Sequence, residues 1–314
     1  MKIVVTGAAG FIGSHLCQFL LEQGKHEVVG IDAFVRDELR IIGSKNMEAF
    51  LAHPRFHFIS KDMLHIEWSE ILKDADIVYH LAGIPGVRSS WGQDFRKYAD
   101  TNILATQQLL EACSNSGIKK FIFASTSSVY GETAGRVSED TGTAPLSPYG
   151  VSKLTGEHLC RVYWKNNGVP IVILRFFTVY GPRQRSDMAF HRFIKQMIAN
   201  EPITLIGDGT QSRDFTYISD CIEATAAVVN KPALIGETIN IGGKERSSII
   251  NVIRDLENLT GKKADIECIG SMRGEPMHTW ADISKAARLL EYKPKVSLTE
   301  GLAEELAYFK KYYT

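Results

Sequence analysis

Residues 2–13 read Lys2-Ile3-Val4-Val5-Thr6-Gly7-Ala8-Ala9-Gly10-Phe11-Ile12-Gly13, and they contain the strongest fold signal of the chain. The β-branched start predicts a buried strand, and the glycines predict a tight turn into a helix. Such a turn lets the backbone approach a pyrophosphate, which the N–H groups and dipole of the helix amino terminus then bind. The spacing is GxxGxxG rather than GxGxxG, so a purely structural turn is the alternative.

Short apolar runs alternate with helical patterns through the first 175 residues. Near-continuous apolar runs are typical of strands buried on both faces, and their alternation with helices predicts right-handed βαβ units. We therefore expect an α/β fold with a doubly wound parallel (Rossmann) sheet. The predicted strands are Ile3–Thr6, Glu27–Asp32, Phe56–Ser60, Ile77–Leu81, Lys120–Ser125 and Ile171–Phe176, and predicted helices include Ile12–Gln23 and Tyr98–Ser114.

The pattern changes after Phe176, where turn residues mix with isolated helical patterns at Ala189–Ala199 and Asp220–Val229. A further apolar run, Glu237–Ile241, could rejoin the sheet. We expect a dinucleotide-binding domain of residues 1–176 plus about 217–245. A smaller mixed α/β domain of about 177–216 plus 246–314 would close over the carboxyl ends of the strands.

Acidic residues after the second and third predicted strands indicate the kind of dinucleotide. Asp32 lies 19 residues after Gly13, where a carboxylate can accept hydrogen bonds from an adenosine ribose. It would repel a 2′-phosphate, so NAD is favoured over NADP, although nearby Arg36 leaves NADP open. Asp62 could hold the adenine amino group or could be an ordinary loop residue.

The composition excludes several other classes of function. Lys+Arg and Asp+Glu both number 36, so no overall charge favours nucleic acid or an anionic membrane. The five cysteines are scattered without CxxC pairs, no His/Cys/Asp group has metal-ligand spacing, and no apolar run has membrane-spanning length. We expect reduced thiols, no metal and a cytoplasmic protein.

Tyr149 and Lys153 are the candidate catalytic pair. Ser147 is typical of an N-cap and Pro148 of the first helical residue, so residues 149 and 153 share one helix face. A lysine ammonium beside a phenol lowers the phenol's pKa, and the resulting phenolate can take a proton from a sugar hydroxyl. Ser125-Thr126-Ser127-Ser128 ends a predicted strand at the edge where such sheets bind ligands.

Taken together, these motifs resemble the extended short-chain dehydrogenase/reductases, specifically the NAD-dependent epimerases and dehydratases of nucleotide sugars. The resemblance covers essentially the whole chain. Besides the motifs above, it rests on His80-Leu81-Ala82-Gly83, Asn102, Leu174-Arg175-Phe176, Val179-Tyr180-Gly181-Pro182, Ser212-Arg213-Asp214-Phe215-Thr216-Tyr217-Ile218-Ser219-Asp220 and Ala281-Asp282-Ile283-Ser284-Lys285-Ala286.

The resemblance implies hydride transfer between sugar C4 and tightly bound NAD, with Tyr149, Lys153 and Thr126 catalytic. The residues expected at the cofactor are Gly7, Gly10, Phe11, Ile12, Gly13, Asp32, Asp62, Met63, Leu81, Ala82, Tyr149 and Lys153. Dehydratases of the family carry an Asp-Glu pair directly after the threonine, and decarboxylases carry a Glu two residues after it. Ser127 and Ser128 stand there instead, which favours epimerisation.

The substrate side resembles UDP-glucuronate 4-epimerases, which interconvert UDP-glucuronate and UDP-galacturonate. A sugar carboxylate needs donors, and the planar fork of Arg185 suits it. Thr178 also favours this activity, because epimerases of neutral UDP-hexoses usually carry Asn there. The residues expected at the substrate are Arg88, Thr126, Ser127, Ser128, Tyr149, Thr178, Arg185, Arg213, Arg273 and Glu275. Arg213 and Arg273 match diphosphate-binding positions, whereas solvated loop charges are the alternative for Arg183 and Arg185.

Three other functions remain open at this point: a 4-epimerase of neutral UDP-hexoses, a UDP-glucuronate decarboxylase, and a catalytically silent NAD-binding scaffold protein. His80 follows an apolar strand and is expected to be structural. Family analogy implies a homodimer packed through the helices near Tyr98–Ser114 and Tyr149–Lys165.

Overall fold

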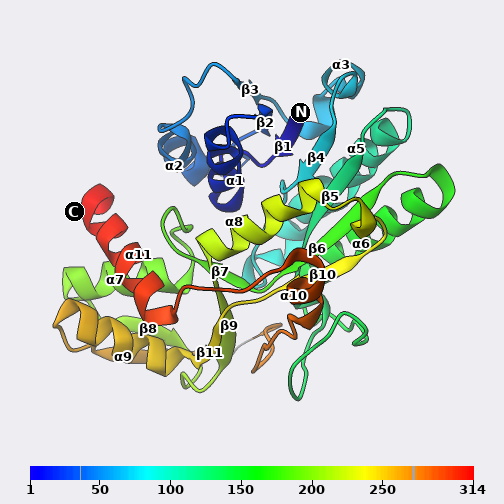
Figure 1. Ribbon diagram of the computed structural model, residues 1–314. Helices are drawn as coiled ribbons and strands as arrows, with labels where there is room; N and C mark the ends of the chain where they lie inside the picture. The colour runs from blue at the N-terminus through cyan, green and yellow to red at the C-terminus, as the bar shows by residue number, and fades with distance from the viewer. Residues whose placement is uncertain (36, 271–272) are drawn as a thin grey trace.

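Seven parallel strands form the central sheet of the computed structural model, which describes residues 1–35, 37–270 and 273–314 (Figure 1). Their order, β10-β6-β5-β4-β1-β2-β3, is that of a doubly wound sheet. The bounds are β1 Lys2–Thr6, β2 Glu27–Asp32, β3 Phe56–Ser60, β4 Ile77–His80, β5 Lys120–Thr126, β6 Ile171–Phe176 and β10 Thr238–Ile241. The predicted fold class is confirmed, and Glu237–Ile241 does rejoin the sheet.

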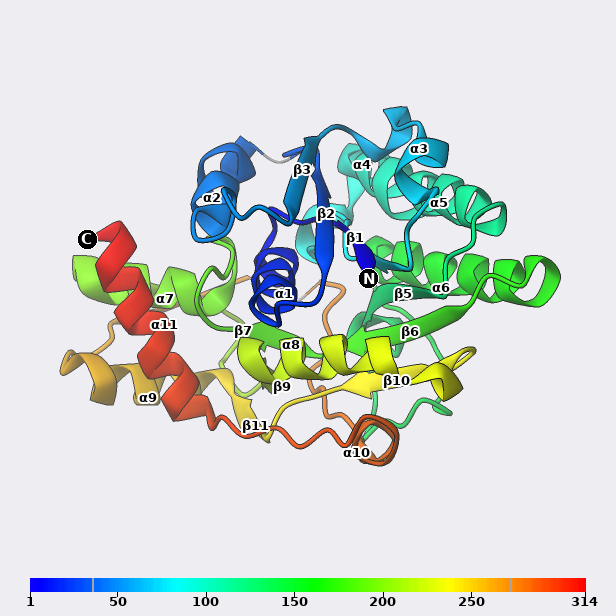
Figure 2. The same cartoon turned by 45° about the horizontal axis from the view of Figure 1, so that its top comes forward.

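Helices cover both faces of this sheet because its side chains alternate between two hydrophobic clusters. Ile3 and Val5 of β1 pack in one cluster with Leu16 of α1, whereas Val4 packs in the other with Leu109 of α5. Helices α1 (Phe11–Glu22) and α8 (Ile218–Ala227) pack together on one face, and α5 (Ala105–Ser114) and α6 (Pro148–Asn167) on the other (Figure 2).

The predicted helix Tyr98–Ser114 is not a continuous α-helix. It begins as α4 (Phe95–Tyr98), widens into a π-helical segment η4 (Ala99–Leu104) and continues as α5. The widening carries Asn102, whose side-chain Oδ1 accepts from the Ile84 N–H at 2.7 Å and whose Nδ2 donates to the Ile84 carbonyl at 3.0 Å. Nδ2 also donates to Ser152 Oγ on α6 at 3.0 Å. Such π-bulges are frequent at functional sites, and this one fixes the loop after β4 against α6.

The rest of the chain forms a smaller mixed α/β part, as predicted. Strands β7 (Thr178–Tyr180), β9 (Ser212–Tyr217) and β11 (Glu245–Ser248) make a three-stranded sheet, and β8 (Ile203–Ile206) pairs in parallel with β12 (Ile266–Ile269). None of these five strands was predicted. The helices here are α7 (Ala189–Ala199), α9 (Ile249–Thr260), α10 (Ser284–Leu290) and α11 (Leu298–Tyr313). Figure 1 shows α7, α9 and α11 grouped away from α5 and α6.

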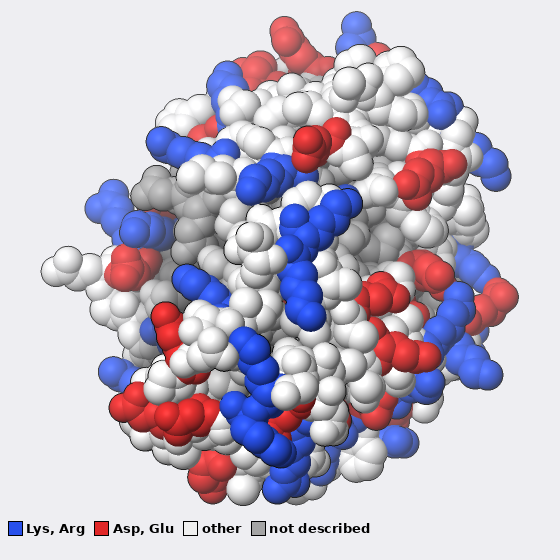
Figure 3. All heavy atoms as spheres, turned by 90° about the vertical axis from the view of Figure 1, so that its left-hand side faces the viewer, with Lys and Arg blue, Asp and Glu red and all other residues white. Residues whose placement is uncertain are grey.

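The remaining elements lie between the strands and helices given above, and all of them except α2 have at most five residues. They are α2 (Asp37–Met47), η1 (Met63–His65), α3 (Trp68–Leu72), η2 (Arg88–Ser90), η3 (Gly92–Asp94), η5 (Ser127–Val129), η6 (Val228–Asn230) and η7 (Pro232–Leu234). No helix within the described ranges is long and apolar enough to span a membrane. Charges of both signs occur on the face shown in Figure 3, where basic side chains run down the middle and acidic ones flank them.

Candidate active site

A cavity of about 660 Å³ opens between the carboxyl edge of the central sheet and the smaller part. Residues from both parts of the chain line it, which is the expected ligand position in an open α/β sheet. Every predicted site residue except Arg273 contributes to the lining: Gly7, Gly10, Phe11, Ile12, Gly13, Asp32, Asp62, Met63, Leu81, Ala82, Arg88, Thr126, Ser127, Ser128, Tyr149, Lys153, Thr178, Arg185, Arg213 and Glu275.

The glycine loop is packed so closely that only glycine fits at two of its positions. Gly7 has a φ of +75°, and a Cβ at Gly13 would lie 2.0 Å from the Gly7 carbonyl oxygen. Gly10 is the N-cap of α1 and carries no side chain to cover the first turn. The loop therefore presents the helix amino terminus directly to the cavity, which fits the pyrophosphate of a dinucleotide.

Asp32 is held rigidly at the end of β2. Its Oδ2 accepts from the Ala9 N–H at 3.1 Å and its Oδ1 from the Phe34 N–H at 2.9 Å. A fixed carboxylate at this point of the cavity fits a ribose diol. Asp62 lines the same cavity and caps η1 by accepting from the Leu64 N–H at 2.9 Å. It therefore stabilises its own loop, which was the alternative to a contact with adenine. Arg36, the residue that left NADP open, lies outside the described residues.

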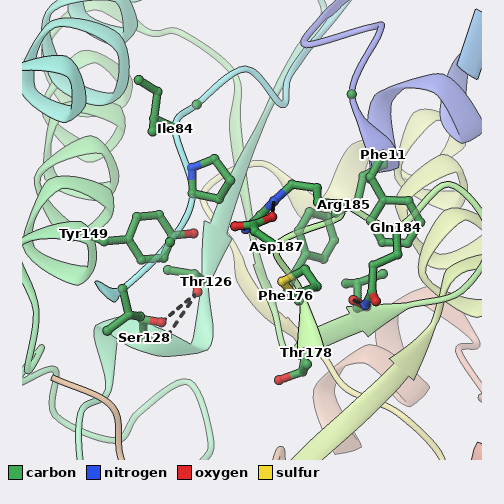
Figure 4. Close-up of a pocket in the computed structure, with 18 of the residues that line it drawn as sticks. Phe11, Ile84, Thr126, Ser128, Tyr149, Phe176, Thr178, Gln184, Arg185 and Asp187 are labelled. Atoms are coloured by element: carbon green, nitrogen blue, oxygen red, sulfur yellow. Dashed lines mark hydrogen bonds and ion pairs between the residues drawn. The ribbon is translucent and has the colours of Figure 1, made fainter. Parts of the chain in front are cut away.

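Tyr149 and Lys153 lie on the first turns of α6, and the start of this helix is confirmed. Ser147 is the N-cap, its Oγ accepts from the Gly150 N–H at 3.1 Å, and Pro148 is the first helical residue. Figure 4 shows Tyr149 pointing from α6 into the middle of the cavity. The Lys153 ammonium lies 4.4 Å from the centre of the Phe123 ring, and burial lowers its pKa to about 8.

The pKa of Tyr149 is raised, which differs from the lowered value that the helix spacing predicted. Burial of the phenol is the largest cause. A hydrogen bond from Thr126 and the charge of Arg185 act in the opposite direction but do not outweigh it. Helical spacing alone could not reveal this, because the burial comes from the walls of the cavity.

Hydroxyl groups gather where β5 ends, as predicted. The Thr126 Oγ1 lies 3.3 Å from Ser128 Oγ, to which it donates, and it accepts from the Ser128 N–H at 3.2 Å (Figure 4). Thr126 therefore faces Tyr149 from a fixed position. Among residues 126–128 the sequence contains no carboxylate, so the general acid and base needed for elimination are missing from this wall.

A buried ion cluster, which sequence reasoning missed, fixes α6 to the sheet. Glu157 is completely buried and accepts from Arg175 Nε at 2.8 Å and Nη2 at 2.7 Å. Ser125 donates to Glu157 at 2.6 Å, and Arg161 Nη2 donates to it at 2.9 Å. Glu157 follows Lys153 by one helical turn, and Ser125 precedes Thr126, so this cluster fixes the catalytic helix relative to β5. The sequence signal for this cluster was Arg175 inside the apolar run Ile171–Phe176, because a buried charge needs a partner of opposite charge.

His80 is structural, as expected. Thr6 Oγ1 lies 2.8 Å from its Nδ1, and Thr106 Oγ1 lies 2.8 Å from its Nε2. Thr106 donates to the Asn102 carbonyl, so it accepts from the Nε2–H of His80. Burial lowers the pKa of His80 to about 3, and it remains uncharged near neutral pH.

The arginines of the substrate side are paired with acidic residues. Glu275 bridges two of them, with its carboxylate 2.9 Å from Arg88 Nε and 3.1 Å from Arg213 Nη2. Arg185 pairs with Asp187, a residue to which the sequence assigned no role. Arg273 lies outside the cavity lining, with its guanidinium 4.0 Å from the centre of the Trp91 ring, and its contact with a diphosphate stays a prediction.

The loop that carries Arg185 is tied to α1. His15 on α1 donates to the Pro182 carbonyl at 2.9 Å, and Arg183 Nη2 donates to Gln18 Oε1 at 2.6 Å. Arg183 adopts a φ of +67°, which a residue with a side chain rarely does. These contacts give Arg183 a structural role and link the helix at the glycine loop to the substrate side of the cavity.

Comparison with known proteins agrees with this geometry. Residues 3–242 match the model of the NAD-dependent epimerase/dehydratase family, and the chain belongs to this family. It is 57% identical over 313 residues to an uncharacterised UDP-glucose epimerase of Bacillus subtilis, covering 100% of this chain and 99% of the relative. It is 39% identical to a UDP-glucuronate 4-epimerase of Thermodesulfobacterium geofontis, covering 98% and 96%.

Solved structures give the same result. The chain is similar to the UDP-glucuronic acid 4-epimerase of Bacillus cereus in complex with UDP-glucuronic acid and NAD. The identity is 58%, the TM-score is 0.98, and both chains are covered completely. The family resemblance inferred from sequence is therefore confirmed.

Proposed function

We propose that this protein is a UDP-glucuronate 4-epimerase that interconverts UDP-glucuronate and UDP-galacturonate through a 4-keto sugar. The observation that carries the proposal is the arrangement in Figure 4, where Tyr149 and the hydroxyls of Thr126 and Ser128 face Arg185 across one cavity. This site offers a proton acceptor for a sugar hydroxyl and a cation for the sugar carboxylate. The resemblance to the Bacillus cereus enzyme, at 58% identity, supports the same activity.

Tyr149 and its neighbours account for the proton transfers. The glycine loop and Asp32 would hold NAD⁺, which would supply the reversible hydride chemistry at C4 of the sugar. Tyr149 accepts the proton of the C4 hydroxyl and gives it back when the other epimer forms. Thr126 lowers the pKa of Tyr149 and favours the phenolate when its hydroxyl turns from Ser128 to Tyr149, and Lys153, with a pKa of about 8, adds positive charge at the same helix face.

The cofactor and substrate assignments from sequence are part of this proposal. We assign NAD to the glycine loop, Asp32 and the neighbouring lining residues, and the sugar to Thr126, Thr178 and Arg185. The pairing of Arg88 and Arg213 with one carboxylate keeps two cations close together, as a diphosphate requires.

Retention of the sugar carboxylate depends on Arg185. A β-keto acid loses CO₂ most easily when its C–CO₂ bond stands perpendicular to the carbonyl plane, and donors on the carboxylate can prevent that geometry. We expect Arg185→Leu to lower turnover of UDP-glucuronate by roughly 10- to 100-fold and to release a UDP-pentose product. Product analysis by NMR checks this, with Arg254→Leu on the exposed side of α9 as the control. Unchanged turnover without any pentose would make Arg185 an ordinary loop charge.

A comparison of two substrates tests the proposed function. UDP-glucose differs from UDP-glucuronate by lacking the carboxylate, and the Bacillus subtilis relative is named as a UDP-glucose epimerase. We expect kcat/KM for UDP-glucuronate to exceed that for UDP-glucose by roughly 100-fold or more, because only the uronate brings a carboxylate that can pair with the guanidinium of Arg185. A preference for UDP-glucose would instead establish the neutral-sugar epimerase.

We also propose a homodimer formed through α5 and α6. Leu104 at the end of η4 and Val151 and Val162 on α6 are apolar and remain 45%, 46% and 52% exposed, where a second copy would cover them. Sedimentation analysis is expected to give about twice the chain mass of 35.0 kDa, and Val162→Glu is expected to shift the protein toward the monomer. A monomer at micromolar concentration would contradict this.

Two further assignments belong to the same proposal. A cytoplasmic location is supported by five free cysteines, four of them buried. The division into residues 1–176 plus about 217–245 and about 177–216 plus 246–314 is supported by the separate sheets of the two parts.

A further inference from the structure

Arg185 is held by an acidic residue within the cavity. Its Nε lies 2.9 Å from Asp187 Oδ1 and its Nη2 lies 2.8 Å from Asp187 Oδ2, so both oxygens are paired with one guanidinium. The Arg185 side chain is 18% exposed and the Asp187 side chain 46% exposed, and both residues line the cavity. Figure 4 shows the pair in the middle of the cavity, where the Tyr149 hydroxyl points toward it.

This contact has the geometry that a sugar carboxylate would adopt on the same arginine. Two parallel N–H···O bonds between a planar fork and a carboxylate are the strongest form of such a pair. The turn that brings the two residues together is closed by the Met188 N–H, which donates to the Arg185 carbonyl at 3.1 Å. The loop is also fastened to α1 by His15 and Arg183. The guanidinium is therefore held in place by a carboxylate of the protein itself.

We propose that Asp187 occupies the position of the substrate carboxylate on Arg185 until the substrate binds. UDP-glucuronate must replace Asp187 on Arg185, which makes Asp187 a specificity-determining residue. This inference rests on the proposed function. A uronate exchanges one carboxylate for another, so Arg185 keeps a partner throughout binding. A neutral UDP-hexose has no group that can replace Asp187, and the closed pair continues to occupy the space beside Tyr149.

The same exchange assists release of the product. UDP-galacturonate retains the carboxylate, so an arginine without a competing partner would hold substrate and product too tightly. Asp187 lowers both affinities by returning to Arg185. The charge of Asp187 also acts on Arg192, which lines the same cavity. A change in substrate affinity on replacing Asp187 must therefore be shown to depend on Arg185.

Binding to variants in a Tyr149→Phe background tests the proposal without turnover. We expect Asp187→Asn to lower the dissociation constant of UDP-glucuronate about three- to tenfold by calorimetry, the range expected for a partly exposed ion pair. The dissociation constant of UDP-glucose should change less than about twofold. The matched control is Asp100→Asn, because Asp100 also pairs with an arginine and is also 46% exposed, but lies outside the cavity lining.

A double-mutant cycle decides which arginine is involved. With Arg185→Leu present, Asp187→Asn should no longer change the affinity for UDP-glucuronate. An effect that persists would show that the coupling does not pass through Arg185 and would overturn the proposal, as would unchanged or weaker binding of UDP-glucuronate to Asp187→Asn. The proposed function fails separately, if the unmodified enzyme does not convert UDP-glucuronate. If the unmodified enzyme converts UDP-glucuronate but Asp187→Asn leaves the affinity for UDP-glucuronate unchanged, only the proposed role of Asp187 is refuted.

Discussion

Tyr149→Phe is expected to lower turnover of UDP-glucuronate by roughly 10³-fold or more, because it removes the phenol that points into the middle of the cavity and accepts the C4 hydroxyl proton in the proposed reaction. Thr126 is a far weaker base, and Lys153 is buried against Phe123. The pKa of Tyr149 is raised by burial, so the phenol is protonated near neutral pH in the protein alone. The reaction therefore requires the positive charges at the site to favour the phenolate.

The fold and the binding sites should be unaffected by this change. We expect Tyr149→Phe to bind UDP-glucuronate within about threefold of the unmodified enzyme, because only one hydroxyl is lost. Tyr312→Phe, which removes an exposed phenol near the end of α11, serves as the control and should keep full turnover. Steady-state kinetics check both variants. Activity within about tenfold of the unmodified enzyme would mean that another group transfers the proton.

Glu157→Gln is expected to lower the free energy of unfolding by about 3–5 kcal/mol, since it leaves a buried guanidinium without its counter-charge. Both partners are inaccessible, with side-chain exposures of 0% for Glu157 and 3% for Arg175. The matched control is Glu111→Gln on the neighbouring helix α5, where the carboxylate is exposed and accepts from Tyr163 at 2.6 Å. That change should cost less than about 1 kcal/mol.

The pKa of Glu157 determines how the difference in free energy of unfolding between the unmodified protein and Glu157→Gln depends on pH. Burial alone would raise this pKa, but the hydrogen bonds and charge of Arg175, together with Ser125 and Arg161, lower it. A carboxyl group whose pKa is lower in the folded state stabilises the fold above its unfolded pKa, and this stabilisation is lost as the pH falls through the folded pKa. Urea denaturation should therefore show the full difference at pH 7 and a shrinking one below about pH 4. A difference that does not depend on pH would contradict an ionised Glu157.

The sequence predicted the parts of the site that depend on local signals. The glycine loop, Asp32 and the capped start of α6 each follow from a few adjacent residues, because turn geometry and helix capping are local properties. Most strands of the large sheet were found because they are buried on both faces and therefore nearly continuously apolar, whereas the edge strand β3 is only partly buried.

The features that were missed depend on distant contacts. The strand β7 has only three residues, and half-exposed β11 reads Glu245-Arg246-Ser247-Ser248, which has no strand signal. The raised pKa of Tyr149 arises from cavity walls on several elements, and Arg273 stacks on a tryptophan far away in sequence. Asp187 is only two residues from Arg185, yet an acidic residue in a polar loop resembles any solvated charge until its side chain is seen in the cavity.

Epimerisation with the carboxylate retained can be measured by incubating the purified protein with UDP-glucuronate labelled with ¹³C at the carboxyl carbon. The arrangement of Tyr149, Thr126 and Arg185 predicts UDP-galacturonate in the proton NMR spectrum, with all the label in sugar carboxylate signals and no accumulation of free NADH. Label appearing as bicarbonate beside a UDP-pentose would show that the site does not protect the 4-keto acid. Unchanged UDP-glucuronate, with conversion of UDP-glucose under the same conditions, would contradict a uronate site at Arg185.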